Sequence, residues 1–176
     1  MCFDVKPPIF DKAGITLITS SIRRASPNVM DAKIHHVNQL NQIMANIEAN
    51  RQGADEAVML DDRGFVAETN STTMFAIKNG ELMTPKPTYI VVGITRGILL
   101  DLAPELDLIP REDDLSLYDF ITAEEAFICG TVGELVPIKS IDGKPIGAKG
   151  ARMPGPFTRA LMARYKAITD TEGTVL

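Results

Sequence analysis

The spacing of apolar residues divides this chain into short strands with helices between them. Residues 14–22 alternate apolar and polar side chains and are rich in β-branched residues, so they predict a strand. The turn-forming residues 26–28 (Ser-Pro-Asn) end it. Apolar residues at positions 37, 40, 43, 44 and 47 recur at helical spacing and predict a helix over residues 37–50, with Gly53 as its stop.

The remaining apolar runs are short and bounded by turn residues, as is typical of strands. They lie at residues 57–60, 65–67, 74–77, 89–92, 108–109 and 125–129. The strands cluster and the helices fall at irregular intervals between them. This arrangement favours an α+β domain built on a mixed, barrel-like sheet over a regular βαβ array.

Two hairpins and two further helices complete the prediction. The Asn-Gly pair within residues 78–81 accepts the positive φ angles of a type I′ turn, so it predicts a tight hairpin. Residues 137–146 predict a second hairpin around their Asp-Gly pair. Helices are expected from Gly93 through Leu102 and over residues 157–168.

Length and charge exclude several classes of protein. A chain of 176 residues is long enough for one well-buried domain and gives no support for a second. The content of 45% hydrophobic and 23% charged residues is ordinary for a globular protein. A net charge of −5 argues against a nucleic-acid partner. The one basic pair, Arg23-Arg24, is interpreted as part of a solvated loop.

The cysteines and the amino terminus give information about the cellular compartment. Cys2 and Cys129 form no disulfide framework, which favours a reducing environment, and Cys129 is expected to be a small buried strand residue. Residues 1–8 lack the pattern of a secretory signal. No apolar run approaches the roughly 20 residues needed to span a bilayer. We therefore expect a cytoplasmic protein without a membrane partner.

Two glycine-containing loops follow apolar runs. Residues 93–96 (Gly-Ile-Thr-Arg) begin a helix, whose free N–H groups and positive dipole end suit a phosphate. The alternative is an ordinary helix cap. Residues 130–133 (Gly-Thr-Val-Gly) offer a second set of N–H and hydroxyl donors, or simply a tight turn. Taken alone, each loop favours the structural interpretation.

Glu68 is the most distinctive single residue. It follows the apolar residues 65–67 and precedes a polar turn. A carboxylate there could hold a protonated pyridine nitrogen through a charge-assisted hydrogen bond worth roughly 1.5–3 kcal/mol. An isolated glutamate at a strand end is more often a surface residue, so Glu68 by itself decides nothing.

Taken together, these segments resemble one family in order and spacing. The matching segments are residues 20–24, 48–49, 55–57, 64–68, 93–96, 130–131, 134–137, 141–143 and 155–158. The chain resembles the fold-type IV (class IV) pyridoxal-phosphate aminotransferases, a family that includes branched-chain and D-amino-acid aminotransferases. The resemblance implies the mixed-sheet large domain of that family, bound pyridoxal 5′-phosphate, and transamination between amino acids and 2-oxo acids.

The resemblance also implies roles for residues of this chain. Glu68 would meet the pyridine nitrogen, and Val91 would lie against the ring face. The phosphate would bind at the two loops, and the second loop would also face the substrate carboxylate. The residues concerned in the two loops are Gly93, Ile94, Thr95, Gly130, Thr131 and Val132.

The match breaks at the family's Schiff-base lysine. Where family members commonly read Asp-x-x-Ile-Lys, residues 31–35 here are Asp-Ala-Lys-Ile-His, so the resemblance places His35 at the lysine position. Imidazole cannot form the exchangeable imine, although with a reference pKa of about 6.5 it can still move a proton. We therefore expect impaired turnover. Lys33 would supply the amine if this segment were a strand shifted by two residues.

Without the resemblance, the pair His35-His36 is interpreted as a strand end with one ring buried and one exposed. Adjacent residues of a strand point to opposite faces, so no metal site is expected. A second departure is Gln39, where many branched-chain enzymes have a tyrosine.

The resemblance covers only the family's larger carboxyl-terminal domain. We expect one domain over residues 1–176, with 1–13 as a lead-in segment and the smaller amino-terminal domain absent. That absence predicts weak cofactor retention and an exposed apolar flank, which a second copy in a homo-oligomer would cover. The alternative is a lysine-less binding or assembly domain that keeps the fold without the reaction.

Overall fold

The computed structural model describes residues 13–34 and 36–172. Within these ranges the strands form one nine-stranded sheet with the order β3-β2-β1-β8-β7-β4-β5-β6, and β9 pairs with β8. The strands are β1 (Ile15–Thr19), β2 (Glu56–Leu60), β3 (Val66–Thr69), β4 (Thr73–Lys78), β5 (Glu81–Pro85), β6 (Ile109–Asp113), β7 (Glu125–Gly130), β8 (Glu134–Ile141) and β9 (Lys144–Pro145).

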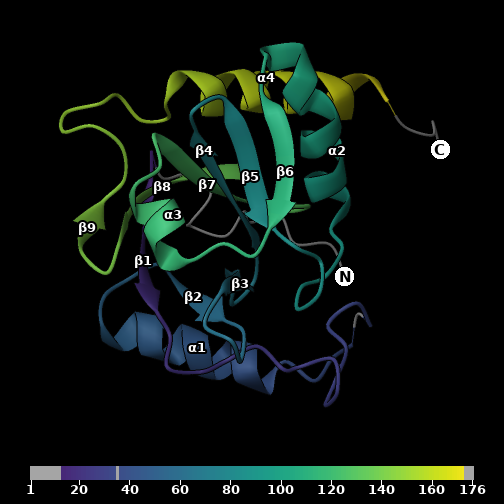
Figure 1. Ribbon diagram of the computed structural model, residues 1–176, viewed down its shortest axis with the longest axis vertical. Coiled ribbons are helices and arrows are strands. Elements are labelled where there is room, and N and C mark those ends of the chain that lie inside the picture. Colours follow the sequence, from purple (N-terminus) through teal and green to yellow (C-terminus); the bar gives the residue numbers. More distant parts are fainter. Residues whose placement is uncertain (1–12, 35, 173–176) are drawn as a thin grey trace.

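Four α-helices and one 3-10 turn surround the sheet in the described ranges. They are α1 (Leu40–Arg51), α2 (Ile94–Leu102), η2 (Ala103–Leu106), α3 (Leu117–Ile121) and α4 (Pro156–Thr171). Helices α1 and α4 lie at opposite ends of the view in Figure 1, and α2 runs beside β6.

The sheet mixes parallel and antiparallel pairs, as predicted. β1 pairs in parallel with β2 through α1, and β5 pairs in parallel with β6 through α2. Parallel neighbours need such a crossover, which explains why helices interrupt the strands at these two places. The hairpins are antiparallel, with φ of 53° at Asn79 and 76° at Gly80 in the first. The predicted α+β fold with a mixed sheet is confirmed.

One face of the central strands packs against α2 and α4. The rings of Phe75 on β4 and Phe127 on β7 stack with centroids 5.2 Å apart at the centre of this layer. Leu99 of α2 and Leu161 of α4 are fully buried in the same cluster. This cluster supports the strands that carry the cavity described below.

Helix α1 packs differently. Its buried residues are Ala45 and Ala49, which lie against β1 and β2 in a small cluster with Ala57 and Met59. The predicted helix is correct apart from its start, which is Leu40 rather than residue 37. Its apolar stripe, however, faces away from the sheet. The exposed stripe consists of Leu40, Ile43, Met44 and Ile47, preceded by the fully exposed Val37.

Several predicted boundaries were wrong. Residues 89–92 form a bend and coil rather than a strand, and they pair with no strand of the described sheet. Residues 31–34 are likewise turns, so the segment before α1 is not a strand in the described residues. β6 extends to Asp113, beyond the predicted residues 108–109, since it pairs along the whole of β5. Helix α3 was missed, although Ser116 and Asp119 form a capping box at its start.

No helix in the described ranges combines the length and apolar character that crossing a membrane requires.

Candidate active site

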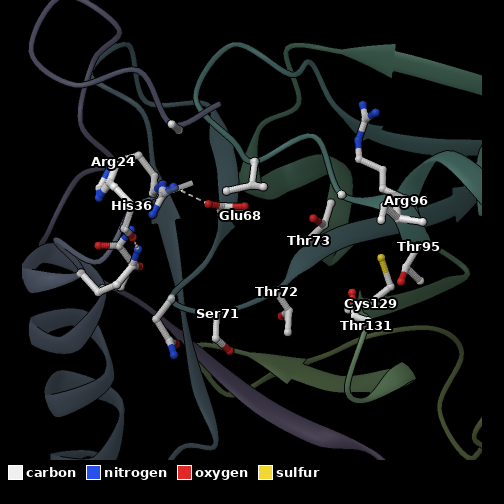
Figure 2. A pocket seen from close by; sticks show the side chains of 18 of the residues that line it. Arg24, His36, Glu68, Ser71, Thr72, Thr73, Thr95, Arg96, Cys129 and Thr131 are labelled. Carbon is white, nitrogen blue, oxygen red and sulfur yellow. Dashed lines mark hydrogen bonds and ion pairs between the residues drawn. The ribbon is translucent and has the colours of Figure 1, made fainter. Parts of the chain in front are cut away.

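A cavity of about 680 Å³ opens between the segment before α1, the turn after β3, the amino end of α2 and the end of β7. Figure 2 shows its side chains converging from these elements, which lie far apart in the sequence. The lining includes Arg24, His36, Glu68, Asn70, Ser71, Thr72, Thr73, Val91, Gly93, Ile94, Thr95, Arg96, Cys129, Gly130 and Thr131, with α1 contributing Gln42 and Ile43.

Glu68 is buried in this cavity rather than exposed at a strand end. It lies on β3 opposite Met59 of β2, and only 7% of its surface is accessible. The Arg24 guanidinium contacts its Oε1 at 2.5 Å, and the Val91 N–H donates to its carboxylate. Burial raises the pKa of Glu68 to about 7, because desolvation outweighs the opposing effects of Arg24 and the Val91 N–H.

Arg24 corrects the expectation of a solvated basic loop. Its side chain is 6% exposed, and its Nε donates to the Tyr89 carbonyl at 3.3 Å while its Nη2 pairs with Glu68. Arg23, by contrast, is exposed. The doublet therefore separates into one surface residue and one buried cation in the cavity wall. A carboxylate with two oxygens retains lone pairs for a further donor after accepting from Arg24 and Val91.

The amino end of α2 forms another part of the wall. Gly93 is the residue before the helix, and no side chain caps it. As at every helix start, the first N–H groups have no acceptor inside the helix, and the dipole places partial positive charge there. The Thr95 hydroxyl lies 3.2 Å from the Tyr165 hydroxyl of α4, which fixes its position at this end. An uncapped helix start beside a cavity suits an anionic group.

The turn after β7 forms the part of the cavity wall next to the amino end of α2. Gly130 and Thr131 line the cavity, whereas Val132 is 69% exposed and is not part of its lining. Cys129 also reaches the wall, and as predicted it is buried in a strand. Burial raises the pKa of its thiol to about 12, so it stays protonated and is no nucleophile at neutral pH.

The hydroxyl-rich wall between these two ends was not predicted from the sequence. Ser71 and Thr72 come from the turn between β3 and β4, and Thr73 is the first residue of β4. Thr72 and Thr73 lie between Glu68 and Thr131 in Figure 2. Beside them the Asn70 Oδ1 accepts the Ala57 N–H at 2.8 Å. The sequence signal for this wall is the unbroken polar run over residues 69–73, directly after Glu68.

The segment before α1 brings His36 to the cavity. His36 is half-buried, and its Nδ1 is buried without a hydrogen-bond partner in the described part of the chain. His35 lies outside the described residues, so its prediction stays untested. Lys33 is exposed, pairs with Asp31 at 3.3 Å and does not line the cavity. The described residues 32–34 form turns and a bend rather than a strand, and the alternative role of Lys33 stays a prediction.

The sequence profile of one family, described as amino-transferase class IV, matches residues 4–141. The chain belongs to the class IV aminotransferase family.

Individual class IV relatives agree with this assignment. A branched-chain-amino-acid aminotransferase-like protein 2 of Arabidopsis thaliana is 46% identical over 169 residues, covering 96% of this chain and 30% of the relative. A branched-chain-amino-acid aminotransferase of Pseudomonas aeruginosa is 40% identical over 153 residues, covering 86% and 49%. The chain thus spans half or less of the length of these two relatives.

A solved class IV structure shares the fold. The branched-chain amino acid aminotransferase from Thermobaculum terrenum, solved in its PLP-form (holo-form), superposes with a TM-score of 0.83 at 34% identity, covering 88% of this chain and 50% of the solved one. This agreement supports the predicted class IV large-domain fold.

The cavity of this chain fits the family's cofactor on three grounds. It holds a buried carboxylate, an uncapped helix start and enough volume for a phosphorylated pyridine. Pyridoxal phosphate carries one basic ring nitrogen and one phosphate, so its two polar ends would meet groups of complementary charge.

Proposed function

We propose that this chain provides the pyridoxal-phosphate half of a class IV aminotransferase acting on amino acids and 2-oxo acids of the branched-chain type. The observation that carries the proposal is the pairing within one cavity of the buried Glu68 with the uncapped start of α2. The alternative interpretations, a surface glutamate and an ordinary helix cap, give no reason for these two features to line the same cavity.

We assign each end of the cavity a different task. Glu68 would bind the ring nitrogen and keep a proton on it, because a buried carboxylate beside Arg24 favours its ionised form once a second cation arrives. The N–H groups and hydroxyls of the two loops would hold the phosphate, while Val91 would lie against the ring. The loop residues proposed are Gly93, Ile94, Thr95, Gly130 and Thr131, with Val132 facing the substrate carboxylate through its backbone.

When bound, pyridoxal phosphate supplies an electron-withdrawing ring that stabilises negative charge at the substrate α-carbon. The chain's own residues then decide how the α-proton moves. No lysine is among the described residues that line the cavity. We propose that an imidazole of the pair His35-His36 is the available proton acceptor, and that turnover is slow because imidazole cannot capture the cofactor covalently.

Cofactor binding is tested by titrating the chain with pyridoxal 5′-phosphate and following ring absorbance. Saturable binding that Glu68→Gln weakens about tenfold supports the proposal, since one charge-assisted hydrogen bond is worth about 1.5–3 kcal/mol. Asp62→Gln serves as the control, because Asp62 is an exposed acid whose carboxylate accepts from the Tyr89 hydroxyl and does not line the cavity. Equal binding by the chain and both variants would mean the cavity is not the site.

Catalysis is tested by restoring the family's amine. The variant His35→Lys is expected to form a borohydride-reducible adduct at position 35 and to gain transamination between leucine and a 2-oxo acid. An adduct at Lys33 in the unaltered chain would instead show that the proposed lysine position is wrong.

The second candidate is a binding or assembly domain that keeps the fold without the reaction. The exposed position of Lys33 outside the cavity favours it. This candidate expects reversible cofactor binding and no transamination in either the unaltered chain or His35→Lys.

We also propose that the chain assembles as a homo-oligomer in the cytoplasm. The exposed stripe of α1, made of Leu40, Ile43, Met44 and Ile47, is a large apolar surface for a helix that flanks a cavity. Light scattering at increasing concentration tests the assembly, and a monomer at every concentration would contradict it.

A further inference from the structure

Glu56 is a buried carboxylate next to the cavity that the proposed cofactor site does not use. It lies on β2, is 5% exposed and does not line the cavity. Three hydroxyls surround it. The Ser71 Oγ donates to its Oε1 at 2.5 Å, and the Oε2 lies 2.5 Å from Thr69 Oγ1 and 3.1 Å from Thr72 Oγ1.

The direction of each hydroxyl proton follows from these contacts. Thr69 Oγ1 accepts the backbone N–H groups of Ser71 at 3.2 Å and of Thr72 at 2.9 Å. Its own proton has two acceptors within reach, Glu56 Oε2 at 2.5 Å and the Thr72 carbonyl at 3.1 Å, and the shorter contact favours Glu56. Thr72 Oγ1 lies 2.7 Å from Thr69 Oγ1 and within reach of Glu56. A carboxylate only accepts, so with the Thr69 proton directed to Glu56 the Thr72 proton lies in the 2.7 Å contact with Thr69 Oγ1 or in the 3.1 Å contact with Glu56 Oε2. Both directions point into the cluster around Glu56.

Two of these hydroxyls, Ser71 and Thr72, also line the cavity. A hydroxyl has one proton and two lone pairs, and here each proton is directed away from the cavity. What these two hydroxyls can offer a ligand in the cavity is therefore lone pairs only. The amino end of α2 at the other part of the wall offers N–H donors. These two parts of the wall thus differ, because the start of α2 offers donors and the Ser71–Thr72 wall offers acceptors.

We propose that Glu56 is a positioning residue that makes the Ser71–Thr72 wall an acceptor surface, and that this wall receives the amino group of the ligand. The inference rests on the proposed function, because it assumes a phosphorylated pyridine ligand. An amine donates to both hydroxyl oxygens, whereas a carbonyl or methyl group at the same place leaves them unpaired. The site therefore favours the aminated form of the cofactor.

The test compares two phosphate-bearing probes by titration calorimetry. Pyridoxamine 5′-phosphate carries the amine, and 4-deoxypyridoxine 5′-phosphate has a methyl group in its place. Neither reacts covalently with lysine. The unaltered chain is expected to bind the amine probe at least tenfold more tightly, and Glu56→Gln is expected to reduce this preference about tenfold. The glutamine amide donates where the carboxylate accepted, so one hydroxyl must turn its proton toward the cavity.

Glu48→Gln is the matched control. Its carboxylate accepts the Ser20 hydroxyl at 2.5 Å and the Ser21 hydroxyl, yet none of these residues lines the cavity. The control is expected to keep the full preference for the amine. Ser71→Ala removes one acceptor, and with it one hydrogen bond to Glu56, but leaves the carboxylate itself in place. Because Ser71 is exposed, this variant tests the proposal if Glu56→Gln does not fold.

The outcomes separate the two proposals. If neither probe binds the unaltered chain, the proposed function itself fails. If both probes bind the unaltered chain equally, the cofactor site stands and the acceptor wall is overturned. The same holds if Glu56→Gln and Ser71→Ala keep the full preference, or if Glu48→Gln loses it as well.

Discussion

Helices α4 and α1 both carry apolar residues at helical spacing, but only α4 buries them. Leu161 and Tyr165 of α4 lie in the core beside Phe127, whereas the corresponding large residues of α1 face outward and two alanines face the sheet. Figure 1 shows the two helices at opposite ends of the sheet. Spacing therefore predicts that a helix forms, while the surface it meets decides which of its faces is buried.

The difference has a physical cause in the strands. Under α1, the sheet presents Ala57 and Met59, and small residues on the helix allow a close approach. Under α4, the large rings of β4 and β7 leave room for branched side chains between them. The α4 end of the sheet, where these side chains are buried, supplies stability. The α1 end borders the cavity, where large apolar residues stay exposed.

The largest effect on the free energy of unfolding is expected at the α4 end of the sheet. Leu161→Ala removes a fully buried side chain from the α4 cluster and should lower the free energy of unfolding by about 3 kcal/mol. Ile43→Ala on α1 is the matched control and should change it by less than about 0.5 kcal/mol, since Ile43 is 55% exposed. Urea unfolding measures both. Equal losses would contradict the contrast between the helices.

Glu68 in the cavity should make the free energy of unfolding depend on pH. The pKa of Glu68 is raised to about 7 in the folded chain, so between its unfolded value and pH 7 the folded state holds a proton that the unfolded state has lost. Stability due to this group is therefore full in acid and is lost as pH rises to about 7, by up to about 3 kcal/mol.

Urea unfolding of the cofactor-free chain between pH 5 and 8 measures this dependence. Glu68→Gln should remove the decline, whatever its effect on absolute stability through the loss of the Arg24 pair. A decline that persists unchanged in the variant would assign it to another group.

A smaller effect is expected where α1 approaches the sheet. Ala49→Leu places a larger side chain between the helix and β2 and should cost about 2 kcal/mol through overpacking. Asn50→Leu, one residue further on and exposed, is the control and should be nearly neutral. Thermal unfolding compares them, and tolerance of leucine at position 49 would mean that α1 is loosely packed.

The smallest effect on stability is expected on the exposed stripe. Ile43→Gln should leave the free energy of unfolding within about 0.5 kcal/mol and yet reduce self-association, because it interrupts the apolar surface. Light scattering of the variant and the unaltered chain checks this. Unchanged association would place the contact surface elsewhere.

Local patterns predicted most of the strands and helices, because period, turn residues and β-branching act over a few neighbours. The Asn79-Gly80 hairpin and the start of α2 after Gly93 are examples. The prediction of a strand at residues 89–92 was wrong, since apolar character alone does not supply a pairing partner. The burial of Arg24 was also missed, because its partner Glu68 is distant in sequence.

The sequence by itself determined the elements, the mixed sheet and the residues that resemble a class IV aminotransferase. Only the tertiary structure decided that Glu68 is buried with Arg24, that α1 turns its apolar stripe outward, and that the Ser71 and Thr72 hydroxyls contact Glu56. The physical reason is that burial and hydrogen-bond direction depend on groups from different strands meeting at a few ångströms, which no spacing along one segment specifies.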